Sequence, residues 1–372
     1  MKKNKGEANH FDSRDMADRR KVSWSRLQGS YKEKTLYPDT NREEFISSIG
    51  QRNRPGLALA CGDMKGEAKY FKLLKSSSVD AFDISEVTLD RAKLHCASLG
   101  LNVNLQVGDI NTIELPKQHY GLVVVAHSFH HFEKIDRIAK QIAESMLPDA
   151  IFILFDYVGP RCLQFSPQQL EHANKFFKRL PPSLRTDRKG EILSQVHPPL
   201  RWGLSENEAI ESPKILPAIE NNFSCIKGLL YGGLMHPVLE RVSASFDTEN
   251  PKHVTILDRL WALDRKLIDN REIEPNFCEL ILVRKDNQLT EKYPAQSFNY
   301  RPIEIDERYE WLVQTSSREI WRLKEIIGKQ HKPKPVTSPG LQRSLLKKLV
   351  RRNKVTHRLA RVINARIKSK KS

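Results

Sequence analysis

The feature that most constrains the fold is the alternation of short, continuously apolar runs with helical patterns between residues 56 and 159. A run that is apolar throughout, without a polar residue at every second position, is typical of a parallel strand covered on both faces. This alternation predicts an open α/β sheet whose strands are joined by crossover helices. The expected strands span residues 56–60, 79–85, 103–109, 120–128 and 151–159, and the helices between them span 67–75, 87–99 and 135–146.

The pattern continues beyond residue 160 with two longer insertions. A helix over 212–222 precedes a sixth strand over 223–233, and a seventh strand over 276–285 is expected to be antiparallel, at an edge of the sheet. The insertions, about 160–210 and 234–275, contain helices and Pro-rich turns. We expect them to lie over the carboxyl ends of the strands as a lid.

The net charge of +17 is concentrated in one segment of the chain. Residues 329–372 hold 15 Lys and Arg and no Asp or Glu, which leaves 47 basic against 45 acidic residues over positions 1–328. A nucleic-acid-binding domain would carry basic residues over its folded surface, so the near-neutral body argues against that function.

The basic tail follows a Pro-rich linker and has an amphipathic pattern of its own. Helical spacing would place its apolar residues largely along one face, with Lys and Arg on the others. Such a helix would suit an anionic membrane surface, an RNA or solvent alone, and the pattern leaves these interpretations open. The apolar residues are Leu346, Leu349, Val350, Leu359, Val362, Ile363 and Ile367.

Cysteine usage and the absence of targeting signals indicate the compartment. No stretch approaches the roughly 18 apolar residues of a membrane span, and the polar N-terminal sequence does not resemble a secretory signal. We therefore expect a cytoplasmic protein, with the tail offering peripheral attachment to the inner membrane surface. Neither a zinc knuckle nor a disulfide framework is expected, because no C-x-x-C pair occurs among Cys61, Cys96, Cys162, Cys225 and Cys278.

Candidate binding residues follow the first three strands, because ligands bind at the carboxyl ends of such sheets. The small residues at 60–62 would let the backbone approach a ligand closely. Asp83 follows the second strand, 21 residues after the glycine of that turn, where a carboxylate can accept hydrogen bonds from both hydroxyls of a ribose. Asp109, after the third strand, suits an exocyclic amine, with Ile110 against a flat ring. These residues predict a pocket for an adenosine.

The stretch from Leu57 to Pro160 resembles the class I S-adenosylmethionine-dependent methyltransferases. The turn after the first strand, "DAFDIS", "LQVGD" and "VVVAHSFHHF" fall in that family's order and spacing. The resemblance implies S-adenosyl-L-methionine as cofactor and a Rossmann-like open seven-stranded, mostly parallel sheet with helices on both faces. It also implies that the first turn contacts the methionine part, the second-strand acid binds the ribose and the third-strand acid binds the adenine. The cofactor-binding residues expected on this basis are Ala60, Cys61, Gly62, Asp83, Ile84, Asp109, Ile110 and His127.

The chain also departs from that family's pattern at its first motif. Ala58 stands where the family usually has an acid, and Ala60 and Met64 stand where it often has further glycines. The usual Pro-Gly-Gly turn before the fifth strand is "LPDA" at residues 147–150. These departures leave open a degenerate, non-catalytic member that serves as a scaffold.

Histidines and acids after the fourth and fifth strands are the catalytic candidates. A sulfonium is an activated methyl donor, so alignment in a water-poor site supplies most of the rate, and a hydroxyl acceptor needs a base in addition. His127 is the first candidate for that base, followed by Asp156 and Tyr157. His130 and His131 either pack the following turn or take part in catalysis. Although the spacing H-x-x-H-H could hold a metal, no Cys or clustered acid lies nearby in the sequence, and we expect no metal site.

The acceptor is expected to lie under the lid. The stretches "FDYVGPRCLQFSPQQL" and "LLYGGLMHPVLE" are similar to bacterial methyltransferases associated with surface-polysaccharide and glycosyltransferase pathways, which implies O-methylation of a carbohydrate or another small molecule. An RNA methyltransferase that uses the basic tail is the alternative, although "AHSFHHF" supplies no N/D-P-P-Y-type motif. Candidate acceptor contacts, or equally residues that hold the lid together, are Arg201, Trp202, Tyr231, Gly232, Gly233 and His236.

Four segments make up the predicted domain organisation. An N-terminal helical segment spans residues 1–53, and a class I methyltransferase domain spans 54–286. A helical extension spans residues 287–328. A basic, Pro-linked tail, which includes the expected C-terminal helix, spans residues 329–372.

Overall fold

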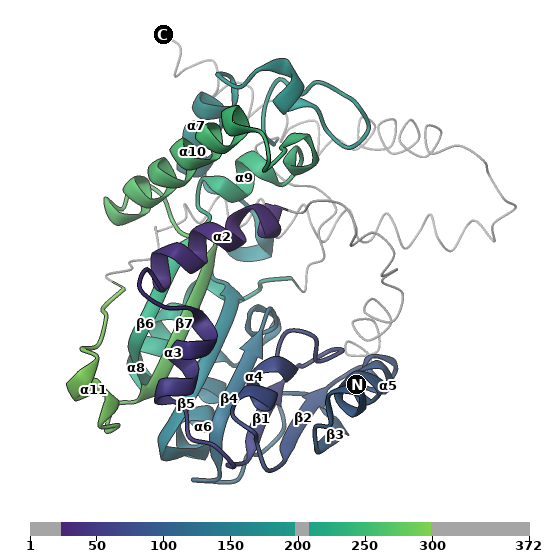
Figure 1. Cartoon of the computed structure of the whole chain (residues 1–372), viewed down its shortest axis with the longest axis vertical. Coiled ribbons are helices and arrows are strands. Elements are labelled where there is room, and N and C mark those ends of the chain that lie inside the picture. The colour runs from purple at the N-terminus through teal and green to yellow at the C-terminus, as the bar shows by residue number, and fades with distance from the viewer. Residues whose placement is uncertain (1–23, 198–207, 299–372) are drawn as a thin grey trace, which may run out of the picture. The chain divides into compact units, whose positions relative to one another are not determined.

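The structure is a computed structural model that describes residues 24–197 and 208–298. Its strands form one seven-stranded sheet. Their spatial order is β3-β2-β1-β4-β5-β7-β6 (Figure 1). Strands β1 to β5 pair in parallel, whereas β7 is antiparallel to both of its neighbours. The predicted Rossmann-like, mostly parallel sheet is confirmed. The strands are β1 Gly56–Leu59, β2 Val79–Asp83, β3 Val103–Val107, β4 Tyr120–Ala126, β5 Met146–Tyr157, β6 Phe223–Tyr231 and β7 Phe277–Arg284.

The helices begin and end at signals that the sequence carries. In α5, which spans Glu86–Leu99, the Ser85 side chain caps the first turn, and Gly100 ends the helix in the left-handed conformation. The other helices are α2 Trp24–Leu36, α3 Arg42–Ile49, α4 Ala68–Leu73, α6 Ile135–Ser145, α7 Pro167–Phe177, α8 Ile215–Asn222, α9 Met235–Leu239, α10 Pro251–Asp269 and α11 Leu289–Lys292. Short 3-10 helices are η2 Phe129–His131, η3 Arg161–Leu163, η4 Pro182–Arg185, η5 Ser212–Lys214 and η6 Ser243–Ser245.

The seventh strand lies inside the sheet, so the prediction that it forms an edge was wrong, although its antiparallel direction is confirmed. β7 pairs with β5 on one side and with β6 on the other, which leaves β6 at the edge. Every residue of β7 except Arg284 is buried. A strand buried along almost its whole length suits the interior of a sheet, since an edge strand would expose one row of its backbone groups.

The fifth strand is longer than its apolar run indicated. It begins at Met146, which pairs with Tyr120 of β4, so "LPDA" at 147–150 lies within the strand and not in a turn before it. The pairing shifts register between Tyr120 and Leu122, which accommodates these residues beside the start of β4.

Two hydrophobic clusters cover the two faces of the sheet, and successive strand residues alternate between them. In β1, Leu57 and Leu59 belong to one cluster and Ala58 to the other. The first cluster includes residues of α6 and α8, and the second includes residues of α3, α4 and α5. The sheet is therefore covered by helices on both faces, as Figure 1 shows.

The two insertions meet each other beyond the sheet. α7 comes from the first insertion, whereas α9 and α10 come from the second, and α9 packs against both (Figure 1). Asp264 of α10 accepts hydrogen bonds from the backbone N–H groups of Gly232 and Leu234, which fixes the turn after β6. The insertions thus form one helical layer with a polar anchor.

The N-terminal helices are tied to the sheet by a buried ion-pair cluster. Arg42 of α3 lies 2.5 Å from a carboxylate oxygen of Glu279 on β7, and Lys32 of α2 lies 3.4 Å from its other oxygen. The Glu279 side chain is only 2% exposed. Because a carboxylate in the middle of a sheet must be paired, these cations hold α2 and α3 in place.

The described residues all belong to one compact unit of the chain. The predicted tail and most of the predicted extension lie outside the described residues, as does the start of the N-terminal segment. Among the helices of the two described ranges, none combines the length and the hydropathy that crossing a bilayer would take.

Candidate functional site

The turn after β1 lies at the point where the strand order reverses, because β1 pairs with β2 on one side and with β4 on the other. Three of its residues adopt positive φ, which are Ala60 at 47°, Gly62 at 49° and Met64 at 60°. A Cβ added at Gly62 would meet no protein atom within 4 Å, so open space lies against this backbone. The turn is therefore shaped for close approach by a ligand, although only one of the three residues is a glycine.

Asp83 at the end of β2 joins this turn to the next helix. One carboxylate oxygen accepts hydrogen bonds from the Ser85 N–H at 2.9 Å and the Thr88 hydroxyl at 3.2 Å, and the other accepts one from the Gly62 N–H at 2.8 Å. Burial raises the pKa of Asp83, and these hydrogen bonds oppose that shift. The carboxylate is thus held in one orientation at the carboxyl edge of the sheet.

Asp109 after β3 is held in a similar way by its own loop. Its carboxylate accepts hydrogen bonds from the backbone and side-chain N–H groups of Asn111 at 2.9 and 3.0 Å. The Asn111 side-chain oxygen in turn accepts one from the Glu133 N–H at 2.9 Å. Ile110 between them is buried. The loops after β3 and β4 are thereby connected.

His127 stands directly after β4 with a positive φ of 59°. Its backbone N–H donates to the Phe155 carbonyl of β5 at 2.6 Å, which fixes this unusual conformation. The side chain reaches the open space of the site, yet the protein packed around the ring lowers the pKa of His127 below 6.5. The imidazole is therefore neutral at physiological pH.

These segments enclose one cavity of about 360 Å³ at the carboxyl ends of β1 to β4. The volume falls within the range of about 300–1,000 Å³ that is usual for small-molecule sites. All eight predicted cofactor-binding residues line it. Its lining consists of Ala60, Cys61, Gly62, Asp63, Lys65, Gly66, Glu67, Asp83, Ile84, Thr88, Arg91, Asp109, Ile110, Asn111, Ala126, His127, Ser128, His131 and Phe132.

Glu67 is a lining residue that the sequence analysis missed. It directly precedes α4 and is only 3% exposed, and burial raises its pKa to about 8. In the sequence, "GEAKYF" is typical of the polar start of a surface helix, and no signal in it distinguishes a buried acid. The fold turns this helix start toward the cavity and so places a carboxyl group in its wall.

Asp156 and Tyr157, the other predicted catalytic residues, do not line the cavity within the described part of the chain. The Asp156 side chain is fully buried and lies 2.6 Å from His130 Nδ1, while it also accepts hydrogen bonds from the Ser128 and Phe129 N–H groups. The Tyr157 hydroxyl donates to the Pro160 carbonyl at 2.8 Å. Asp156 is therefore placed to shape the histidine turn, and Tyr157 to fix the start of the first insertion.

The candidate acceptor residues at the end of β6 and at the start of the second insertion pack inside the protein. Tyr231 stacks on Phe277 of β7, and His236 contacts the same ring edge-on. A Cβ added at Gly233 would lie 2.2 Å from the Glu274 carbonyl oxygen, so only glycine fits there. These contacts hold the helical layer together. Arg201 and Trp202 lie outside the described residues.

Comparison with known proteins identifies this region. The family model described as "Methyltransferase domain" matches residues 57–149. Residues 57–149 are a methyltransferase domain. The match spans β1 to the beginning of β5 and includes every residue that lines the cavity among those described. It confirms the predicted enzyme class, an S-adenosyl-L-methionine-dependent methyltransferase.

Solved methyltransferase structures are similar to this chain. A geranyl diphosphate C-methyltransferase from Streptomyces coelicolor A3(2) is 11% identical, with 76% of this chain and 97% of that chain covered and a TM-score of 0.42. An S-adenosylmethionine-dependent methyltransferase from Mesorhizobium loti is 14% identical, with 69% and 100% covered and a TM-score of 0.38. No protein with a curated description matches the sequence.

The cavity of the methyltransferase domain fits S-adenosyl-L-methionine, which supplies an activated methyl group on a sulfonium. Asp83 offers a fixed carboxylate for a ribose, and Ile84 and Ile110 offer apolar surface. The first strand has Ala58 at the position where an acid is usual, and Glu67 places a carboxyl group in the wall of the cavity. The open space against Gly62 leaves room for a ligand at the turn.

Proposed function

We propose that this methyltransferase methylates a hydroxyl oxygen of a carbohydrate or another small molecule in the cytoplasm. The observation that carries the proposal is the position of His127, whose neutral imidazole lines the same cavity as the predicted cofactor-binding residues. A hydroxyl acceptor must lose a proton during methyl transfer, and a neutral imidazole within reach is suited to accept it.

The residues of the domain divide the work between binding and proton transfer. Asp83 binds the ribose, Asp109 with Ile110 binds the adenine, and the turn at 60–62 contacts the methionine part of the cofactor. His127 accepts the proton of the acceptor hydroxyl. Because alignment alone can supply up to roughly 7–11 kcal/mol of the barrier reduction, no stronger base is required.

Support for a glycan acceptor comes from the sequence around the insertions, which is similar to bacterial methyltransferases of polysaccharide pathways. The helical layer of α7, α9 and α10 belongs to these insertions and provides surface beyond the common sheet. We propose that this layer, together with residues 198–207 outside the described part, determines which acceptor is bound.

Calorimetric titration of S-adenosyl-L-methionine and S-adenosylhomocysteine into the full chain tests the cofactor site. Replacing Asp83 by Asn removes a charged acceptor, whose hydrogen bonds are worth about 1.5–3 kcal/mol each, so we expect affinity to fall by roughly 10- to 150-fold. Asp90→Asn, at an exposed position of α5, is the matched control and should bind as the wild type does.

Absence of binding to folded wild-type protein would favour the non-catalytic scaffold. If the cofactor binds, transfer of a labelled methyl group to sugars, lipid-linked glycans and RNA tests the acceptor class. Transfer of the label to RNA but not to sugars would overturn the carbohydrate proposal and favour the RNA methyltransferase.

We also propose that the basic tail attaches the enzyme to an anionic membrane surface, where a lipid-linked glycan would be available. Each basic residue near such a surface adds about 1 kcal/mol before screening by salt. Sedimentation of the full chain with phosphatidylglycerol vesicles should exceed that with phosphatidylcholine vesicles. Replacing Lys347, Lys348, Arg351 and Arg352 by Gln should reduce it, and equal pelleting would remove the idea.

A further inference from the structure

Two adjacent histidines and a glutamate from a distant part of the sequence converge beside the cofactor cavity. Glu208 Oε2 lies 3.6 Å from His130 Nε2 and 3.8 Å from His131 Nε2. These atoms all lie within 4.8 Å of one another. His130 and Glu208 are buried, and His131 is nearly so, with its side chain 15% exposed. Glu208, which lies 77 residues after His131, therefore supplies the acidic group that the sequence around the H-x-x-H-H spacing lacks.

The two distances from Glu208 to the histidines are close to those between ligand atoms of a metal coordination shell. A tetrahedral ion with nitrogen ligands at about 2.0–2.1 Å and oxygen ligands at about 2.0–2.2 Å keeps neighbouring ligand atoms roughly 3.4 Å apart. The two observed distances exceed this by only a few tenths of an ångström. The two imidazole nitrogens lie within 4.8 Å of each other, so binding an ion would also draw the histidines together.

Asp156 orients His130 as an outer partner of such a site. The Asp156 carboxylate lies 2.6 Å from His130 Nδ1, so Nδ1 donates a hydrogen bond to Asp156 and Nε2 faces Glu208, where loss of the Nε2 proton would free that nitrogen for a metal ion. Asp156 is itself held by the Ser128 and Phe129 N–H groups at 3.0 and 2.6 Å. Metal-binding histidines are commonly fixed by a carboxylate in this way.

The backbone around Glu208 is also fixed. The Cys162 N–H donates to the Ala209 carbonyl at 3.2 Å, and the Ser212 hydroxyl donates to the Gly159 carbonyl at 2.7 Å. These bonds hold residues 208–212 against the beginning of the first insertion, beside η2. The carboxylate is therefore presented to the two histidines by a supported segment.

We propose that His130, His131 and Glu208 bind a divalent transition-metal ion such as Zn²⁺ at the wall of the cofactor cavity. Two imidazoles and one carboxylate are a usual ligand set for catalytic zinc, which keeps a further position for water or substrate. His131 also lines the cavity, so the ion lies where an acceptor could reach it. Its further role rests on the proposed function: as a Lewis acid it lowers the pKa of the acceptor hydroxyl, whose proton passes to His127.

Zinc titration of the full chain tests the site. The protein, free of any histidine tag, is stripped with a chelator, dialysed and titrated with Zn²⁺ by calorimetry. We expect one equivalent to bind to the wild type. Since loss of an outer partner alone costs about 10- to 100-fold, Glu208→Gln and His131→Gln should each weaken binding by at least about 100-fold. Titration with Co²⁺ gives an absorption spectrum that reports tetrahedral coordination directly.

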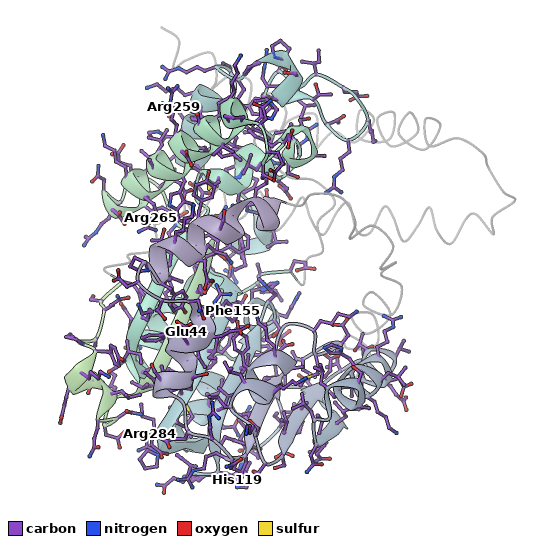
Figure 2. All side chains as sticks on the ribbon, in the orientation of Figure 1. Glu44, His119, Phe155, Arg259, Arg265 and Arg284 are labelled. Atoms are coloured by element: carbon purple, nitrogen blue, oxygen red, sulfur yellow. The ribbon has the colours of Figure 1, made fainter. Side chains whose placement is uncertain are left out.

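The matched control is His119→Gln. This exposed histidine precedes β4, at the opposite end of that strand from the site, and Figure 2 labels it. It should bind Zn²⁺ as the wild type does. Circular dichroism of the metal-free variants shows whether each is folded. If one ligand variant does not fold, the other still tests the site.

Wild-type affinity in both ligand variants, or no zinc binding by the folded wild type, would overturn the metal site. The S-adenosyl-L-methionine titration is run on the same samples. Cofactor binding without zinc binding removes this inference and leaves the proposed function. Zinc binding without cofactor binding removes the proposed function and leaves the metal site.

Discussion

Asp83 Oδ2 accepts a 2.8 Å hydrogen bond from the backbone N–H of Gly62, which ties the ends of β1 and β2 together. The residue proposed to bind the ribose thus also shapes the turn proposed to contact the methionine part. Any change in this turn should therefore alter cofactor binding as well as stability.

Gly62→Ala should separate these two effects when it is compared with Gly100→Ala. Both glycines have positive φ and open space at the Cβ position, so each substitution should cost about 1–2 kcal/mol of stability. Only Gly62 lines the cavity, where an added methyl group should weaken S-adenosyl-L-methionine binding by roughly 10-fold or more. Urea unfolding and calorimetry measure the two quantities. Equal cofactor affinities in the two variants would contradict the site.

Glu67→Gln should remove a pH dependence of stability. The pKa of Glu67 is raised from 4.5 to about 8, so the folded state disfavours the charged form. The neutral group's contribution is fully present below pH 4.5 and is lost as pH rises toward 8, on the order of a few kcal/mol. Urea unfolding between pH 5 and about 8 should show the wild type losing stability relative to Glu67→Gln. Parallel profiles for the two proteins would mean that Glu67 is not desolvated.

His127→Ala should lower kcat by roughly 10²- to 10⁴-fold, the usual contribution of a general base. Because desolvation by the surrounding protein lowers the pKa of His127 below 6.5, the residue stays neutral down to mildly acidic pH. In the wild type, kcat/KM should therefore be level above about pH 6.5 and fall as pH decreases below the lowered pKa. A carboxylate or amine acceptor would give a His127→Ala variant close to wild-type activity. His119→Gln serves again as the control.

The sheet and most of the residues that line the cavity could be predicted from the sequence because both depend on local patterns. Continuous apolar runs mark interior strands, and the small turn, Asp83 and Asp109 each follow one of them. The edge position of β7 was predicted wrongly because strand order depends on long-range pairing. Glu67 and Glu208 were missed for a related reason: only tertiary packing turns the first toward the cavity and brings the second to His130 and His131.

Arg42→Met should lower the free energy of unfolding by about 3–5 kcal/mol, because it leaves the buried Glu279 carboxylate with less compensation. Lys32 still contacts Glu279, which favours the lower end of that range. Arg54→Met is the control, since Arg54 and Asp149 are both about half exposed and 3.7 Å apart, and it should cost no more than about 1 kcal/mol. Urea unfolding at neutral pH compares them. Equal small losses would show that the buried cluster does not hold α3 to the sheet.

The positive φ angles of Ala60 and Met64 have a consequence for how such chains evolve. The turn after β1 has left-handed torsions at two positions that are not glycine, at a strain of about 1–2 kcal/mol per residue that a well-packed sheet can tolerate. Side chains in this motif can therefore drift while the contour presented to the ligand persists. Distant relatives that have lost their glycines should be traceable by torsion angles long after their residue identities have diverged.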